Sequence, residues 1–294
     1  MDIVFVILHY KTYKDTIACV SSIRNRLDTG NYKIVIVDNG SKNGSYEILS
    51  KEYETSKDVI IIQNEDNLGF SRGLNVGIEY ANKKWSPSFV AAINNDTQII
   101  SSHFWEILYK KYNKHHFALL GPMIVSKDGY CCTNPIRDTP RNKKEVYKII
   151  KRYKRILKII KSRMYTLYGF LQRMKCRIGK EARDLPVIED CVDYKLHGSF
   201  LVFSKEYFSK FSGLDGRTFL YGEEDILYLH ILKNGLHTLY TPEILIYHKE
   251  DSSTSEAIPN TEKKMAFVCK NCIDSLNIYL DTIDYYEKEN VNVT

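Results

Sequence analysis

The stretch Phe89–Ile100, which reads FVAAINNDTQII, carries the clearest fold signal in the sequence. Its first five residues are apolar without alternation, a pattern typical of a strand buried on both faces of a parallel sheet. The apolar run stops at Asn94, Asn95 and Asp96. Open α/β sheets bind ligands at the carboxyl ends of their strands, and an aspartate there is a hard oxygen ligand suited to Mg²⁺ or Mn²⁺. Taken alone, the pattern fits equally well a strand followed by a turn in which Asp96 caps a helix.

The segments around this stretch alternate between strand and helix patterns. Apolar runs at 3–8, 33–37 and 58–63 are each followed by a segment that reads as a helix, at 15–26, 41–53 and 71–82. This alternation predicts an α/β fold with a doubly wound, mostly parallel twisted sheet and helices on both faces. Further strands are expected at 117–125, 200–203, 238–240 and 244–247, and further helical segments at 207–211, about 225–233 and 261–280.

Three of the predicted strands end in polar side chains, namely His9-Tyr10, Asp38-Asn39 and Asn94-Asn95-Asp96. In a parallel sheet these ends lie at one edge, where a base, a ribose and a diphosphate could be held. For Asp38-Asn39-Gly40 a plain turn is the alternative, because Asn-Gly is a strong turn former. The stretch 67–73, NLGFSRG, has neither GxGxxG nor GxxxxGK[ST], which disfavours NAD enzymes and P-loop NTPases.

The composition is that of an ordinary globular protein, with 44% hydrophobic and 27% charged residues among 294. No apolar run is long enough to span a bilayer, and the first residues, MDIVFVILHY, have no basic region typical of a signal peptide. We therefore expect a cytoplasmic protein.

Seven cysteines in a chain of this size argue against a disulfide framework, and Cys269-x-x-Cys272 has no second pair at zinc spacing.

The positive charge is concentrated in residues 141–183, which hold 16 Lys/Arg and 2 Asp/Glu, whereas the rest of the chain has a net charge of −8. The segment's apolar residues recur at three- and four-residue steps: Val146, Ile149, Ile150, Tyr153, Ile156, Leu157, Ile160, Met164, Leu167, Leu171 and Met174. This pattern predicts a basic amphipathic helix, or two joined near Gly169, on an anionic membrane surface. The alternatives are a helix packed on the body or one that forms a homodimer. Nucleic acid is disfavoured because the body is acidic.

The ordered segments resemble the family 2 glycosyltransferases, particularly their rhamnosyltransferase-like bacterial members. The matching stretches span most of residues 1–250: Val37–Ser41, Asn64–Asn75, Asn94–Thr97, Gly198–Phe203, Phe219–Asp225 and Pro242–His248. The resemblance implies a GT-A fold, sugar transfer from a nucleotide-sugar with inversion at the anomeric carbon, and a divalent cation, Mg²⁺ or Mn²⁺.

The resemblance also implies roles for individual residues. The nucleotide pocket would be lined by His9, Tyr10, Asp38 and Asn39. The donor would be flanked by Asn67, Gly69, Phe70, Asn75, Asn94 and Asn95. Asp96 would hold the metal-bound diphosphate as the last Asp of the family's DxD motif, in which Asn94 replaces the first Asp and removes one charge. His248, at the end of a predicted strand, would contribute to the metal or diphosphate site.

The acidic residues Glu223, Glu224 and Asp225 match the family's acceptor-side motif, which supplies the general base. Two alignments are open. Matching Leu227 to the leucine that follows the motif makes Glu224 the base, and matching the Glu-Asp pair makes Asp225 the base. We favour Glu224 because that alignment needs no gap. Carboxylates also favour helix N-termini, so a helix start is the plain alternative.

These observations predict four regions: a nucleotide-sugar-binding half (1–140), a basic helical insertion (141–183), an acceptor-side half (184–250) and a C-terminal helical region (251–294). The expected enzyme transfers rhamnose from dTDP-rhamnose, or a hexose from a UDP-hexose, to a growing surface polysaccharide or lipid-linked glycan at the inner face of the plasma membrane. A nucleotidyltransferase or a non-catalytic nucleotide-sugar-binding protein of related fold is the alternative. A nucleotidyltransferase would need a glycine-rich basic signature after the first strand, where this chain has His9-Tyr10-Lys11.

Overall fold

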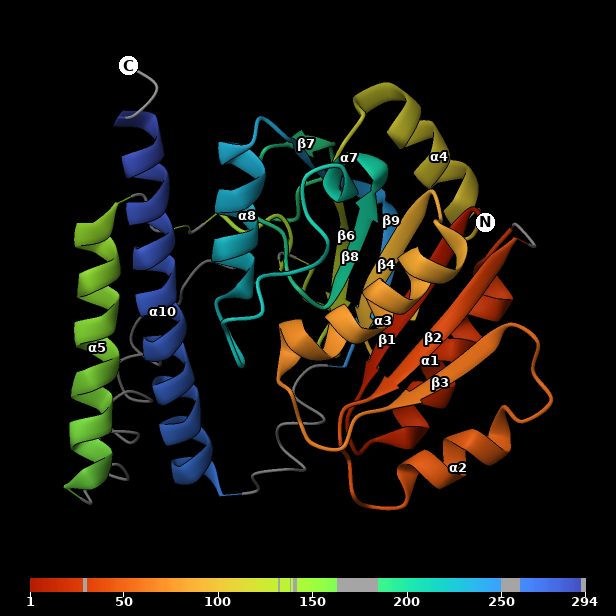
Figure 1. Ribbon diagram of the computed structural model, residues 1–294, viewed down its shortest axis with the longest axis horizontal. Helices are drawn as coiled ribbons and strands as arrows, with labels where there is room; N and C mark the ends of the chain where they lie inside the picture. Colours follow the sequence, from red (N-terminus) through yellow and green to blue (C-terminus); the bar gives the residue numbers. More distant parts are fainter. Residues whose placement is uncertain are drawn as a thin grey trace.

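The computed structural model describes residues 1–28, 31–131, 133–137, 139, 142–162, 185–249 and 260–291. A twisted sheet lies at its centre with helices on both faces (Figure 1). The first half contains β1 (Ile3–His9), α1 (Tyr13–Arg26), β2 (Tyr32–Asp38), α2 (Ser45–Glu52), β3 (Val59–Gln63), α3 (Phe70–Trp85) and β4 (Phe89–Asn94). The second half contains β5 (Thr97–Ile99), α4 (Phe104–His115), β6 (Leu119–Ser126), α5 (Lys143–Lys161), β7 (Cys191–Val192), β8 (Phe200–Ser204), α7 (Lys205–Phe208), α8 (Glu223–Lys233), β9 (Thr238–His248) and α10 (Thr261–Val291).

The described strands form one sheet in the order β3-β2-β1-β4-β8-β6-β9-β5, with β7 paired to β9. The strands β3, β2, β1 and β4 are parallel, as predicted. Strand β8 runs antiparallel to both β4 and β6, whereas β9 is parallel to β6. The predicted α/β class with a mostly parallel sheet is confirmed. The alternation did not indicate the antiparallel strands, which are β8 and the short strands β5 and β7 that pair with β9.

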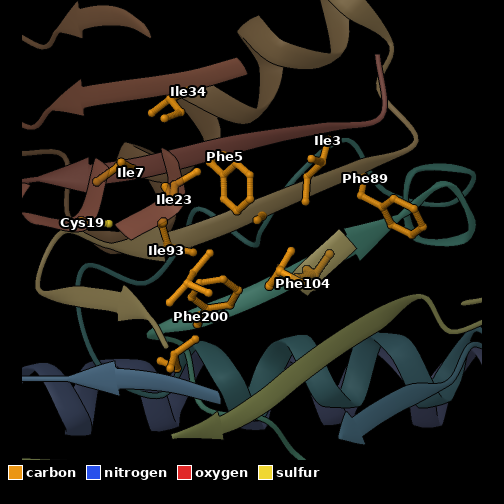
Figure 2. Close-up of a cluster of buried hydrophobic side chains, with 14 of the residues drawn as sticks. Ile3, Phe5, Ile7, Cys19, Ile23, Ile34, Phe89, Ile93, Phe104 and Phe200 are labelled. Carbon is orange, nitrogen blue, oxygen red and sulfur yellow. The ribbon is translucent and has the colours of Figure 1, made fainter. Parts of the chain in front are cut away.

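The apolar runs at Ile3–Ile7 and Phe89–Ile93 form neighbouring central strands, and all ten residues are at most 1% exposed. Their side chains alternate between the two faces of the sheet. On one face Phe5 packs with Phe104 of α4 and Phe200 of β8, and residues of α1 complete the cluster (Figure 2). On the other face the core residues of β1 and β4 pack with α3 and α8. The sheet is therefore buried on both sides, which explains the continuous apolar runs.

The region around Pro242 differs from the prediction of two short strands. The structure has a single strand, β9, whose pairing with β6 shifts register: Pro122 pairs with Thr241 and Met123 pairs with Leu245. The three extra residues around Pro242 form a bulge, which is where a sheet tolerates a proline that has no N–H to donate. The strand continues past the bulge and ends at His248. Strand β5 and helix α4 were also not predicted.

The predicted basic helix is present as α5, and residues 163–184 of the segment lie outside the described residues. Its apolar face packs against α10, in a buried cluster that also includes Ile226 of α8. The alternative of a helix packed on the body therefore holds for this part. Figure 1 shows α5 and α10 side by side, with α5 outermost. None of the helices in the described part of the chain has the combined length and apolar character of a membrane-spanning segment.

Helix α3 approaches the sheet so closely that one position requires glycine. A Cβ on Gly77 would collide with Val6 and would lie 2.9 Å from Cγ2 of Val37. Both valines are fully buried in the sheet, so neither can move aside easily.

We expect Gly77→Ala to lower the free energy of unfolding by about 1–3 kcal/mol in urea titrations, as overpacking does. The control Lys83→Ala, on the exposed side of the same helix, should change it by less than about 0.5 kcal/mol. A Gly77→Ala variant as stable as the wild type would contradict this packing.

Candidate functional site

The predicted polar strand ends do meet at one edge of the sheet. In the register of the parallel strands, His9 pairs with Asp38 and Leu8 pairs with Asn94. Asn95 and Asp96 follow directly after β4. The residues that sequence reasoning assigned to nucleotide and diphosphate binding are therefore neighbours.

His9 and Asp38 lie beneath the surface of this edge, each at 0% exposure. The Nδ1 atom of His9 is 2.7 Å from the Thr16 hydroxyl, and its Nε2 atom is 2.8 Å from the Ser45 hydroxyl. Burial lowers the pKa of His9 to about 4, so the ring is neutral at physiological pH. These bonds hold the end of β1 against α1 and α2.

Asp38 is held by a hydrogen bond from the Ser41 hydroxyl to its Oδ1 atom. Its Oδ2 atom is buried without a hydrogen bond of good geometry to the described residues. Burial raises the pKa of Asp38, an effect that the Ser41 hydrogen bonds and the nearby Gln63 side chain oppose. Among the predicted pocket residues of these two strands, partly exposed Tyr10 has the most direct access to a ligand.

Asn39 organises the glycine-containing loop after β3. Its Nδ2 atom donates to Asn67 Oδ1 and to the Gly69 carbonyl, each at 3.0 Å. Its Oδ1 atom accepts from Asn64 Nδ2 and from the Leu68 N–H, each at 3.1 Å. The loop therefore occupies both the nitrogen and the oxygen of the Asn39 amide. Asn39 positions the loop and has no group left to bind a ligand.

Three other predicted donor residues join this loop and α3 to the acceptor-side half. The Phe70 N–H donates to the Phe219 carbonyl over 2.8 Å, and a Cβ on Gly69 would collide with that carbonyl. Gly69 has φ of +83°, a backbone conformation that favours glycine. Asn75 donates to the Leu214 carbonyl and accepts from the Leu214 N–H, both over 2.8 Å. These contacts fix the segment that leads to the acidic cluster.

Asp96 and His248 lie next to each other at this edge. Strands β5 and β9 pair Thr97 with His248, which brings His248 Nε2 to 3.2 Å from Asp96 Oδ1. Both side chains are 7% exposed. Asn95 is turned toward α1, where its Nδ2 atom donates to Thr12 and Thr16. The partly buried Asn94 bonds through its backbone.

The Asp96–His248 pair has the chemistry of a divalent-cation site. One carboxylate oxygen and one imidazole nitrogen converge, and both atom types are ligands for Mn²⁺ or Mg²⁺. The Nδ1 atom of His248 is buried and has no hydrogen-bond partner among the described residues. The donor set therefore fits the cation that the resemblance implies.

The three acidic residues at the start of α8 have different environments. Glu224 Oε1 accepts a hydrogen bond of 3.1 Å from the Gly198 N–H. Asp225 Oδ1 is 2.6 Å from the ammonium group of Lys195, which is itself 7% exposed. Burial raises the pKa of Asp225, an effect that Lys195 opposes. Glu223 is 7% exposed, and its Oε1 atom has no partner in the described part of the chain.

His197 belongs to the same site and was missed by sequence reasoning. Its ring centroid lies 5.7 Å from that of His248, while the next residue, Gly198, contacts Glu224. Burial lowers the pKa of His197. Because the Ser199 N–H can only donate, its 3.2 Å contact makes Nδ1 the acceptor. The neutral ring then carries its proton on Nε2, for which the described residues offer no hydrogen bond.

The sequence held a signal for His197. The residues His197-Gly198-Ser199 come directly before a buried apolar run, and in an antiparallel strand the residues before the run lie at the ligand edge. An all-parallel reading would have placed them at the opposite edge.

A second group of carboxylates and histidine lies on the surface at Asp28, His103 and Glu106, and all three are exposed. Asp28 accepts from the Trp105 N–H at 2.8 Å and from the Glu106 N–H at 3.3 Å. It therefore caps the N-terminus of α4, which explains the cluster without a metal.

A sequence profile described as Glycosyl transferase family 2 matches residues 4–175, which is more than half of the chain. The chain belongs to glycosyl transferase family 2. The family resemblance drawn from the ordered motifs is thereby confirmed, whereas specificity for rhamnose stays a prediction.

Individual relatives of this family 2 member agree with its fold. The Haloferax volcanii protein described as low-salt glycan biosynthesis hexosyltransferase Agl10 is 25% identical over 223 residues, which are 76% of this chain and 59% of that protein. The chain thus spans less than two thirds of the length of this curated relative. A crystal structure of GalNAc-T7 with UDP, GalNAc and Mn²⁺ has a TM-score of 0.57 at 15% identity, over 86% of this chain and 45% of that one. A crystal structure of S. aureus TarS 1–349 has a TM-score of 0.53 at 12% identity, over 87% and 63%. These structures share the GT-A fold.

The buried Glu223 gives a pH-dependent stability that can be measured. Burial and the neighbouring Glu224 raise its pKa from an ordinary 4.5 to about 8. Between these values the unfolded chain releases the proton and the folded chain keeps it, so the free energy of unfolding falls as the pH rises from 4.5 to 8. Glu223→Gln cannot ionise and should lose this decline, becoming more stable relative to the wild type toward pH 8 by on the order of a few kcal/mol.

Urea titrations at several pH values between 5 and 8 test this, with Glu52→Gln, an exposed residue of α2, as the control. The control should follow the wild type at every pH. If Glu223→Gln also follows the wild type, Glu223 is ionised in the folded protein and the account of its burial is wrong.

Proposed function

We propose that this chain is an inverting glycosyltransferase that moves a sugar from a nucleotide-sugar to a hydroxyl group of a glycan acceptor. The observation that carries the proposal is that two adjacent residues, His197 and Gly198, contact different parts of the site. His197 packs against His248 of the Asp96–His248 pair, and Gly198 holds Glu224. These contacts support a proposed diphosphate site and a proposed carboxylate base at the same edge of the sheet.

Asp96 and His248 are the residues proposed to hold the divalent cation. When bound, the cation would supply positive charge that stabilises the diphosphate leaving group. The N–H of His197 at Nε2 would donate to an oxygen of the same diphosphate, because its other nitrogen is occupied by Ser199. Partly exposed Tyr10 would contact the rest of the nucleotide-sugar, and the buried His9 and Asp38 would hold the strand ends behind it.

Glu224 is the proposed general base. The acceptor hydroxyl would give its proton to the Glu224 carboxylate as its oxygen bonds to the anomeric carbon, while the bond from that carbon to the diphosphate oxygen breaks and the electron pair leaves with the diphosphate. The Gly198 N–H orients the carboxylate and leaves one of its oxygens for the acceptor. Asp225 is engaged by Lys195, which makes it the weaker candidate. Glu223, with its raised pKa, is protonated and cannot act as the base at neutral pH.

The proposed donors are dTDP-rhamnose and UDP-hexoses, and the proposed acceptor is a growing surface polysaccharide or a lipid-linked glycan. The relative described as a hexosyltransferase of glycan biosynthesis supports a hexose donor and a glycan acceptor. The GalNAc-T7 structure, which holds UDP and Mn²⁺, supports a nucleotide-sugar with a cation. A lipid-linked acceptor would place the reaction at a membrane surface, in keeping with the predicted cytoplasmic and peripheral location.

A panel of nucleotide-sugars tests the proposal through release of free nucleoside diphosphate. The wild type is compared with Glu224→Gln, Asp225→Asn and the double variant Lys195→Met/Asp225→Asn, which avoids leaving Lys195 buried without its partner. Glu224→Gln should lower kcat by about 10²–10⁴-fold, as loss of a positioned base does, with donor affinity in calorimetry little changed. The double variant at 195 and 225 should keep more activity than Glu224→Gln.

Two results would contradict parts of this proposal. An inactive Asp225→Asn beside an active Glu224→Gln would move the base by one residue. Binding of nucleotide-sugars with no diphosphate release from any of them, with or without glycan acceptors, would favour the non-catalytic binding protein.

A further inference from the structure

Helix α5 has two opposite faces of different chemistry. Val146, Ile150 and Ile156 are at most 9% exposed, and they pack in a cluster with residues of α8 and α10. At the helical repeat, all Lys and Arg residues from Lys144 to Lys161 fall on the other half of the circumference. Each of these eight residues is exposed.

The exposed cations have no counterions in the described part of the chain. Only the first lysine of α5, Lys143, is paired there, with Asp284 and Glu287 of α10. That pair fixes the start of α5 to the end of α10, so the orientation of the basic face is set by the fold. The basic face therefore extends about 25 Å along the outermost helix, with its charges free to meet an external anionic partner.

We infer that this basic face docks the protein on a bilayer that contains anionic phospholipids, and that it does so by charge alone. A helix that inserts into a membrane needs an exposed apolar face, and that face of α5 is covered by α10. Lys and Arg side chains near an anionic surface are attracted to it, and salt screens the attraction. A straight, convex helix can approach a flat layer of phosphate headgroups along its whole length. Proteins that bind single-stranded nucleic acids place aromatic side chains among the basic ones, and Tyr147 is the single aromatic residue on the exposed side of α5.

The inference deepens the proposed membrane location but does not need catalysis, so it is tested by binding. Vesicles of phosphatidylcholine, with and without phosphatidylglycerol, are sedimented with the wild type and with the Glu224→Gln variant over a range of NaCl concentrations. Both proteins should bind the mixed vesicles at low NaCl concentration and dissociate from them as the concentration rises. Neither should bind vesicles of pure phosphatidylcholine. A wild-type protein that binds the mixed vesicles but releases no nucleoside diphosphate from any nucleotide-sugar would count against the catalytic proposal alone.

Two fourfold variants with the same change of charge locate the surface. The test variant changes the centre of the basic face: Lys148→Gln, Lys151→Gln, Arg155→Gln and Lys158→Gln. The control changes exposed lysines outside α5: Lys51→Gln, Lys57→Gln, Lys83→Gln and Lys114→Gln. Each basic residue near an anionic surface raises the binding constant by about fivefold, so the test variant should bind the mixed vesicles on the order of several hundredfold more weakly. The control variant should bind nearly as tightly as the wild type. Circular dichroism and the urea midpoint verify that both variants fold.

Three results would overturn the inference. Equal binding to neutral and mixed vesicles would show that charge is not the cause. Equal weakening in both fourfold variants would show that net charge acts without a defined surface. Retention by a single-stranded or duplex nucleic acid, with no binding to mixed vesicles at the same salt, would identify a different class of partner.

Discussion

The candidate site depends on the antiparallel pairing of β8 with β4. The Asn94 N–H donates to the Ser199 carbonyl over 2.9 Å, and Ile93 pairs with Phe200. Because the two strands run in opposite directions, the residues that precede β8 lie where β4 ends. His197 and Gly198 are thereby placed beside Asp96, and they carry the contacts to His248 and Glu224. A parallel β8 would have sent these residues to the far edge of the sheet.

The polar residues around this edge mostly bind one another. His9 and Asp38 are buried in a network with hydroxyl groups of α1, α2 and the loop after β2. The side-chain amides of Asn39 and Asn75 form hydrogen bonds with loops from both halves of the chain. Buried hydrogen-bond networks of this kind restrict motion, and a lost partner leaves a further buried polar group unpaired. In the described part of the chain, the site therefore combines a few polar groups that can still bind a ligand with a larger number whose hydrogen bonds hold the site in shape.

The sequence predicted the first half of the fold well because its signals are local. Continuous apolar runs and helical spacing fix β1 to β4 and their helices, and they also place polar residues at the strand ends. The Asp96–His248 pair depends on the β5–β9 pairing, which joins distant segments, so its geometry required the structure even though the family resemblance named both residues. His197 was missed because the direction of β8 is decided by tertiary pairing. For α5 the pattern predicted two faces but could not show that α10 covers the apolar one.

The central claim is that the edge formed by β4, β8 and β9 binds a cation and a nucleoside diphosphate. Anomalous diffraction from crystals grown with Mn²⁺ and UDP tests it most directly. We predict a manganese peak within coordination distance of Asp96 Oδ1 and His248 Nε2, with the diphosphate beside His197. A manganese peak confined to the exposed cluster of Asp28, His103 and Glu106, or UDP bound away from this edge, would contradict the account.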